Sequence, residues 1–140
     1  MQATAIFLPT LALMLWTALV LLQVPIRRFR AYFQRRVDAQ AFRYGDSPQV
    51  PPDVALPNRV FMNLLEVPTL FYVLTLIAFV TGHVTPALVD LCWVYVALRV
   101  AHSLIYFTYN HSVHRFAVFA ASNLIVLALI FDLGYGLLGG

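Results

Sequence analysis

The sequence predicts an all-α integral membrane protein, a four-helix bundle with up-down topology. Apolar residues make up 61% of the 140 residues and charged residues only 11%, which is more apolar side chain than a soluble domain of this size can bury. Four stretches, 3–26, 60–81, 86–109 and 116–138, each reach the length of about 20 residues that crosses the hydrocarbon of a bilayer. We therefore expect one transmembrane domain over residues 1–140.

The first stretch, 3–26, is expected to remain attached as a membrane span. No charged residue precedes it, whereas a secretory signal peptide carries basic residues before a shorter apolar region. From Arg27 to Tyr44, apolar residues and arginines alternate in a way that predicts a helix continuing past the lipid headgroups. Prolines follow in the segment 46–57, where we expect an extended loop because proline lacks the backbone donor that a helix needs. The whole connection 27–59 is thus expected to lie outside the membrane.

The remaining spans are joined by short turns at 82–85 and 110–115, which force neighbouring helices to pack antiparallel. Seven of the nine arginines lie in 27–59, an eighth is Arg115, and the turn 82–85 has none. By the positive-inside rule, the arginine-rich connections are cytoplasmic and both termini lie on the non-cytoplasmic side. A bacterial inner membrane is favoured, or the endoplasmic reticulum for a eukaryotic source.

The basic residues flank hydrophobic spans, so we interpret them as signals that set the orientation of the spans in the membrane. We therefore expect no nucleic-acid partner. Cys92 is the single cysteine, so an intrachain disulfide is excluded. It lies in an apolar run. No spacing typical of metal ligands is present, and we expect no metal site.

Two of the spans carry a polar stripe along one helix face, because their polar residues recur every three or four positions. The stripe of the second span consists of Arg59, Asn63 and Glu66. The stripe of the third span consists of Tyr95, Arg99, His102 and Tyr106. An unpaired charge inside a membrane costs at least about 2.5 kcal/mol, and Glu66 and Arg99 would lie at similar depth. We therefore predict a Glu66–Arg99 ion pair, with Asn63 and His102 as hydrogen-bonding neighbours.

Further polar residues lie toward the cytoplasmic end and outline a cationic pocket that opens inward. They are Arg27, Arg28, Arg59, Asn63, His102, Tyr106, Tyr109 and Arg115. Several guanidinium groups around one carboxylate suit a ligand that carries carboxylates and at least one ammonium. The alternative interpretation is that the polar residues only fix the register of packed membrane helices.

This pattern resembles the MAPEG superfamily, the membrane-associated proteins of eicosanoid and glutathione metabolism, over essentially the whole chain. The residues that carry the resemblance are Arg59, Asn63, Glu66 and Pro68 on the second span, Arg99, His102 and Tyr106 on the third, and Arg115 at the start of the fourth. Val67 and His102 stand where leukotriene-synthase-like members have tyrosines. These departures resemble divergent bacterial members.

The resemblance implies a homotrimer that binds glutathione, as co-substrate, between adjacent subunits. The implied binding residues are Arg27, Arg28, Arg59, Asn63, Glu66, Arg99, His102 and Tyr106. Arg115 would be the catalytic residue, since a nearby cation lowers the pKa of a thiol and populates the nucleophilic thiolate. The implied activity is a transferase or peroxidase acting on lipophilic electrophiles that arrive from membrane lipid. The alternatives are a non-catalytic lipid- or glutathione-binding homologue and a structural subunit of a larger membrane complex.

Overall fold

Long helices account for most of the chain in the computed structural model, which describes residues 2–139. The elements are η1 (Ala3–Ile6), α1 (Phe7–Phe33), η2 (Ala39–Phe42), α2 (Pro52–Leu65), α3 (Val67–Val80), α4 (Pro86–Phe107) and α5 (Ser112–Gly139). Residues 2–139 contain no strand. Four helical segments are long and apolar enough to cross a membrane: Ala3–Phe33, Pro52–Val80, Pro86–Phe107 and Ser112–Gly139. The predicted class, an all-α integral membrane protein with four spans, is confirmed.

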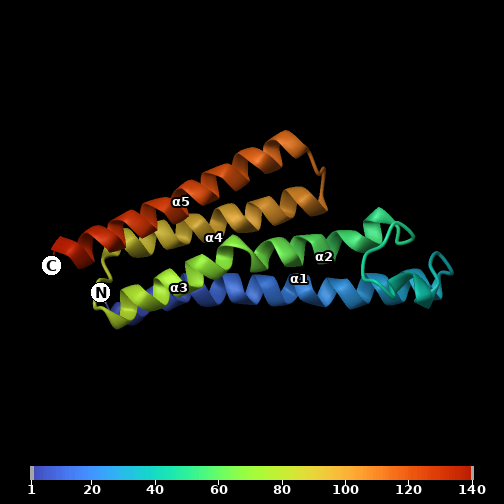
Figure 1. Ribbon diagram of the computed structural model, residues 1–140, viewed down its shortest axis with the longest axis horizontal. Coiled ribbons are helices and arrows are strands. Elements are labelled where there is room, and N and C mark those ends of the chain that lie inside the picture. Colours follow the sequence, from blue (N-terminus) through green and yellow to red (C-terminus); the bar gives the residue numbers. More distant parts are fainter. Residues whose placement is uncertain (1, 140) are drawn as a thin grey trace.

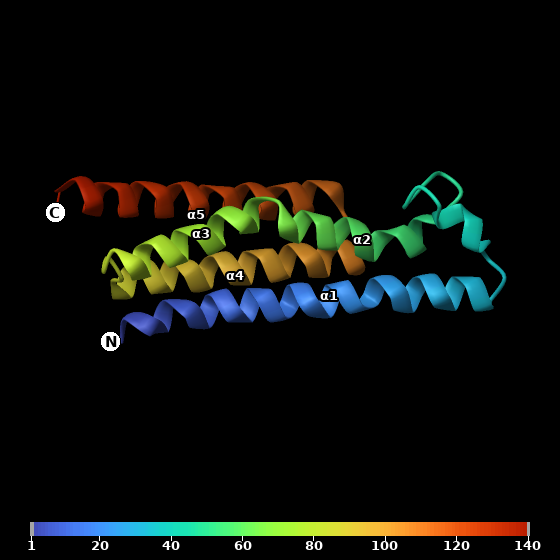
Figure 2. The same cartoon turned by 60° about the horizontal axis from the view of Figure 1, so that its bottom comes forward.

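The four spans run side by side along the length of the molecule (Figure 1). In both Figure 1 and Figure 2, α1 and α5 lie on opposite sides of the pair formed by α4 and the combined helix α2–α3. The start of η1 and the end of α5 lie at one end of the bundle, and the connection from α1 to α2 lies at the other. We call the latter the arginine-rich end.

The core follows from the apolar residues that face the centre of the bundle. Leu13, Phe71, Tyr95 and Leu129, from four different helices, are at most 2% exposed. Many other large apolar side chains remain exposed on the outer faces. Such outward-facing apolar residues are what a lipid environment requires, since the spans need no polar coat there.

The helix expected from Arg27 to Tyr44 is confirmed as far as Phe33, where α1 ends, and is wrong beyond it. Arg35 adopts a left-handed backbone conformation with φ of 56°. Around it, the N–H of Arg36 donates to the carbonyl of Ala31 at 2.9 Å and the N–H of Arg35 donates to that of Tyr32 at 3.0 Å. These two bonds form a Schellman motif, which satisfies the last carbonyls of a helix and turns the chain away.

The loop expected over 46–57 is present over 46–51 but wrong from Pro52 onward, where α2 begins. Proline is compatible with the first position of a helix, where the missing N–H has no partner in any case. Pro57, however, lies inside the helix and cannot donate to the carbonyl of Asp53, four residues earlier. Arg27 of α1 supplies the missing donor, with its Nη1 3.0 Å from that carbonyl oxygen. A side chain from the neighbouring helix therefore allows α2 to include Pro57.

The second span is broken at Glu66, where ψ is −100°. Pro68 lies at the start of α3 and cannot donate to the carbonyl of Leu64. The carbonyl of Leu65 is satisfied by the hydroxyl of Thr69. The carbonyl of Asn63 keeps only a long bond, 3.4 Å, from the N–H of Glu66. The break thus leaves the Asn63 carbonyl available to another part of the protein.

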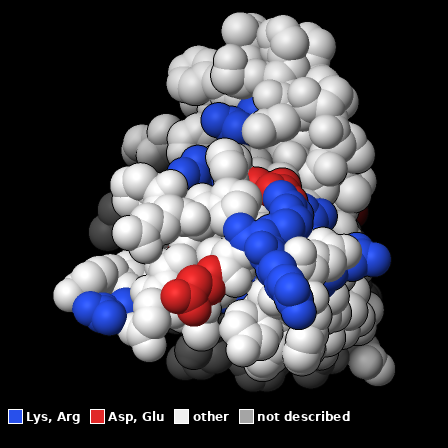
Figure 3. Space-filling model, turned by 90° about the vertical axis from the view of Figure 1, so that its right-hand side faces the viewer, with Lys and Arg blue, Asp and Glu red and all other residues white. Residues whose placement is uncertain are grey.

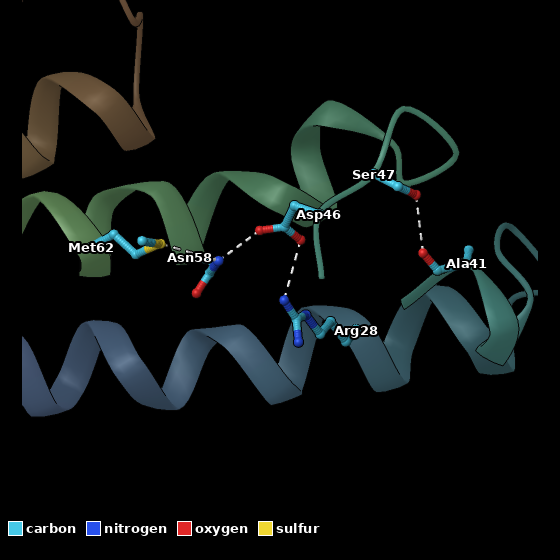
Figure 4. Close-up of polar contacts among 6 residues, drawn as sticks. All are labelled: Arg28, Ala41, Asp46, Ser47, Asn58 and Met62. Carbon is cyan, nitrogen blue, oxygen red and sulfur yellow. Dashed lines mark hydrogen bonds and ion pairs between the residues drawn. The ribbon is translucent and has the colours of Figure 1, made fainter. Parts of the chain in front are cut away.

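The connection between α1 and α2 is fastened by Asp46 (Figure 4). One carboxylate oxygen of Asp46 accepts from Arg28 of α1 at 3.2 Å, and the other accepts from Asn58 of α2 at 2.7 Å. Nearby, the Ser47 hydroxyl donates to the carbonyl of Ala41 at 3.1 Å. We call the contacts of Asp46 with Arg28 and Asn58 the Asp46 clamp.

Candidate functional site

Arg99 of α4 is the centre of the polar site and is completely buried, at 0% exposure. Its Nη2 donates to the backbone carbonyl of Asn63 at 3.1 Å and also to the side-chain oxygen of Asn63. Its Nη1 lies 3.5 Å from the hydroxyl of Ser122 on α5. The guanidinium group therefore donates to the Asn63 carbonyl, which lacks a good helical donor because the second span is broken. It also links α2, α4 and α5.

The predicted Glu66–Arg99 ion pair is wrong. Within residues 2–139, the ion pairs are Arg28–Asp46 and Arg36–Asp53. Glu66 is exposed at the junction of α2 and α3. The unusual ψ of Glu66 takes this residue out of the regular helix. The side chain of Asn63, in place of Glu66, accepts the hydrogen bond from the guanidinium group of Arg99. The predicted role of Asn63 as a hydrogen-bonding neighbour of Arg99 is confirmed. The same role predicted for His102 is wrong, because within residues 2–139 Arg99 bonds Asn63 and Ser122 and His102 makes ring contacts with Tyr106 and Phe119.

A pocket of about 210 Å³ opens beside this cluster, between α2, α4 and α5. Four residues singled out from the sequence line it: Asn63, His102, Tyr106 and Arg115. The rest of its wall comes from the first turns of α5, through Ser112, Phe116 and Phe119. Helices that are separate in sequence thus bring the third-span stripe and the fourth-span arginine to one cavity.

Arg115 is half-buried in this pocket and is held in place by two contacts. Its guanidinium carbon lies 4.0 Å from the centre of the Tyr106 ring, and its Nη1 donates to the side chain of Asn110. The imidazole of His102 meets the Tyr106 ring edge-on, with the ring centres 5.7 Å apart. A cation fixed over an aromatic wall, with no acidic side chain lining the pocket, is suited to receive an anionic group.

The buried guanidinium group of Arg99 adds to this preference. Its Nε has no hydrogen-bond partner within residues 2–139, and neither has the hydroxyl of the buried Tyr95. The acceptors around Arg99 are neutral oxygens, so its positive charge is not cancelled by a carboxylate in contact with it. Two arginines therefore give this part of the bundle a net positive character.

The other candidate residues lie outside the pocket of the single chain. Arg59 is exposed on α2, one turn before Asn63. Arg27 donates to Asp53 and lies over the ring of Phe107 of α4, 5.5 Å from its centre. Arg28 points to another side of α1, where it contacts Asp46 and lies 5.1 Å from the centre of the Phe42 ring.

Ser112, Phe116 and Phe119 of the pocket and Ser122 beside Arg99 were not singled out in the sequence, and two of these four contact Arg99. Ser122 contacts Arg99, and the Phe119 ring lies 5.7 Å from the guanidinium carbon of Arg99. The spacing could have identified Phe119 and Ser122. With Arg115 they are spaced four and three residues apart, so the three share one face of α5.

Comparison with protein-family models matches residues 6–135 to the MAPEG family. No curated protein and no solved structure matches the chain in the corresponding comparisons. The matched region contains all four spans almost entirely and every candidate residue of the site. The family includes glutathione-related transferases and peroxidases as well as non-catalytic members. With the family match extending over nearly its whole length, this four-span chain belongs to the MAPEG family.

Proposed function

We propose that this protein is a glutathione-dependent transferase or peroxidase that acts on lipophilic electrophiles in the membrane. The observation that carries the proposal is the half-buried guanidinium group of Arg115 over Tyr106, in a pocket next to the buried Arg99. Membership of a family with glutathione-related enzymes supports the choice of ligand. Glutathione also fits the charges, since it carries two carboxylates, one ammonium and a thiol.

In this proposal, most of the polar residues hold the tripeptide. The guanidinium group of Arg59 receives a carboxylate, because a planar guanidinium pairs well with a carboxylate. Arg99 is fully buried, and its positive charge favours an anionic ligand from behind Asn63. The carboxylate of Glu66 receives the ammonium, and Asn63, His102 and Tyr106 supply neutral hydrogen bonds. From α1, Arg27 lies toward α2 and α4 and is better directed to the ligand than Arg28.

The proposed chemistry depends on Arg115. Its positive charge stabilises the thiolate form of glutathione, which is the nucleophile, and the thiol proton passes to water. In a transfer reaction, the sulfur forms a bond to an electrophilic carbon while the leaving group departs with its electron pair. In a peroxidase reaction, two glutathione molecules are oxidised to the disulfide while a hydroperoxide is reduced to an alcohol and water.

A second subunit is part of this proposal. The pocket of about 210 Å³ is smaller than the roughly 300–1,000 Å³ of typical ligand sites, and Arg59 and Glu66 face away from the packed interior. A neighbouring subunit placed against α2 would close the site and cover these charges. We therefore propose a homotrimer with glutathione bound between subunits.

The test is glutathione conjugation to 1-chloro-2,4-dinitrobenzene by the full-length protein in neutral detergent. We expect Arg115→Ala to lower kcat by about 10²- to 10³-fold, the usual effect of removing one group that stabilises a developing anion. Arg115→Lys should retain part of the rate, because it keeps a positive charge. Arg43→Gln is the matched control, since Arg43 is an exposed arginine that contacts Gln40, outside the pocket.

The result also separates the alternatives. Turnover that survives Arg115→Ala unchanged would contradict the assigned mechanism. Glutathione binding without turnover of either an aryl halide or a lipid hydroperoxide would identify a non-catalytic member. A protein that binds no glutathione and copurifies stoichiometrically with other membrane chains would be a structural subunit.

A further inference from the structure

A second pocket, of about 580 Å³, lies at the arginine-rich end between α1 and η2. Its walls are mostly apolar and aromatic, and they include Val24, Phe29, Tyr32 and Phe42. Arg28 is the charged residue that lines it. No residue of this pocket lines the one beside Arg115, so the two are separate sites. We call it the α1–η2 pocket.

A cationic hollow of about 620 Å³ adjoins the α1–η2 pocket. Two arginines, Arg35 and Arg36, and one acidic residue, Asp38, line the hollow. Tyr32 lines both cavities, so they share a wall. In Figure 3, which views the arginine-rich end, basic side chains gather on this face with few acidic ones between them. An apolar cavity thus adjoins a charged one in which arginines outnumber acidic residues two to one.

The two cavities follow one another along α1, from the membrane span toward the arginine-rich end. The apolar pocket begins at Val24, within the first span, and the hollow reaches Arg35, just past the end of α1. At about 1.5 Å per residue, Val24 and Phe33 at the end of α1 are roughly 14 Å apart along the helix axis, and Arg35 follows the helix end. The apolar part is therefore nearer the hydrocarbon and the basic part farther from it, which is the arrangement of the chain and headgroup of a lipid.

We propose that α1 and η2 bind one anionic phospholipid of the leaflet at the arginine-rich end. An acyl chain occupies the α1–η2 pocket, and the negatively charged headgroup rests on Arg35. Basic clusters immediately beyond a membrane span attract anionic lipids, and the aromatic walls supply the apolar contact that a solvated basic patch lacks. Arg28, implied by family resemblance to bind glutathione, borders this lipid instead.

The backbone at Arg35 supports the assignment. Arg35 occupies the left-handed position of the Schellman motif, with φ of 56°, where glycine is the usual residue because a Cβ is unfavourable there. Arg36 is already neutralised by two bonds to the carboxylate of Asp53, at 2.7 and 2.9 Å. The side chain of Arg35 makes no hydrogen bond or ion pair within residues 2–139, so its charge is available to a ligand. A costly conformation that presents an unpaired charge points to a binding role.

The η2 side of the pocket is held in advance by the Asp46 clamp. Asp46 bonds both Arg28 of α1 and Asn58 of α2 (Figure 4). Arg28 in turn lies over the Phe42 ring, 5.1 Å from its centre. The wall formed by η2 is therefore fixed to the helices before any ligand arrives. A preformed pocket binds more tightly because less ordering is needed.

The test is lipid retention by the full-length protein in neutral detergent, measured by native mass spectrometry. Phosphatidylserine and phosphatidylcholine with the same acyl chains are added in separate titrations, and we expect preferential retention of one phosphatidylserine per chain. Arg35→Gly should lower the affinity for phosphatidylserine by roughly fivefold, the effect of one arginine at a lipid surface. The same substitution should raise the thermal unfolding temperature, because glycine suits the left-handed position. Arg43→Gln, outside both cavities, should change neither quantity.

A second variant tests the apolar half of the site. Ala39 is exposed and lines the α1–η2 pocket, so Ala39→Trp should fill it and abolish phosphatidylserine retention without lowering the unfolding temperature. Equal retention of the two lipids, or wild-type affinity in Arg35→Gly, would overturn the proposal. Displacement of phosphatidylserine by an equimolar amount of oleate would also overturn it, because the occupant would then be a free fatty acid.

Discussion

At the scale of single residues, Asn63 is the residue on which Arg99 depends. A buried guanidinium group that loses a hydrogen-bond acceptor is left partly unsatisfied, at a cost of about 1–3 kcal/mol. We therefore expect Asn63→Ala to lower the free energy of unfolding by that amount in the absence of glutathione, as measured by titration with a denaturing detergent. Glu66→Gln should change it by less than about 0.5 kcal/mol, because Glu66 is exposed and makes no ion pair with Arg99. A larger loss for Glu66→Gln than for Asn63→Ala would contradict this assignment.

The sequence predicted the members of the site better than the contacts between them. Spacing along each span indicated which polar residues share a helix face, and Asn63, His102, Tyr106 and Arg115 do line one pocket. Spacing could not decide between Asn63 and Glu66 as the partner of Arg99. That choice depends on the backbone angle of Glu66, where the helix is interrupted. Pro68 was the available signal, because a proline removes a donor to the residue four positions earlier.

At the scale of helices, α1 and α2 are coupled through a proline. Arg27 donates to the Asp53 carbonyl that Pro57 cannot satisfy, so Arg27→Met should cost about 0.5–1.5 kcal/mol. In a Pro57→Ala background, the restored N–H can bond that carbonyl, and Arg27→Met should cost less. A double-mutant cycle should therefore give a coupling energy of at least about 0.5 kcal/mol between the two positions. Additive effects would show that Arg27 does not replace the missing donor.

The positions of the membrane spans were predicted better than the helix ends outside the membrane, for a physical reason. A run of about 20 apolar residues has few alternatives to a membrane span, so the positions of all four spans could be predicted from hydropathy. Helix ends outside the membrane depend on individual hydrogen bonds. The Schellman motif that ends α1 uses Arg35 in place of the usual glycine, and α2 continues across Pro57 because of a side chain from α1. Neither arrangement has a signature in the local sequence.

At the scale of the whole molecule, the exposed charge of Glu66 requires an explanation. Glu66 lies within the helical segment Pro52–Val80, which is long and apolar enough to cross a membrane. A carboxylate turned toward hydrocarbon would cost at least about 2.5 kcal/mol on the most lenient scale, and Arg59 on the same helix adds a second charge. Neighbouring apolar side chains such as Met62 and Leu70, both more than half exposed, could pack equally well against lipid or protein. The charges therefore favour a neighbouring subunit, with a polar ligand between the two chains, over direct contact with lipid.

This reasoning leads to a prediction about assembly and ligand binding together. Native mass spectrometry should find a homotrimer, and glutathione at about 100 times its Kd should stabilise that trimer by about 2.7 kcal/mol for each occupied site, observable as a rise in thermal unfolding temperature. Glu66→Gln should reduce the rise, because the ammonium of glutathione loses its carboxylate partner, while the ligand-free trimer unfolds at nearly the same temperature. Dilution that separates the trimer into single chains should abolish glutathione binding, since the pocket of about 210 Å³ is too small to enclose the ligand alone. Single chains that bind glutathione as tightly as the trimer would show that one chain contains the complete site, and the exposed Glu66 would then need another partner.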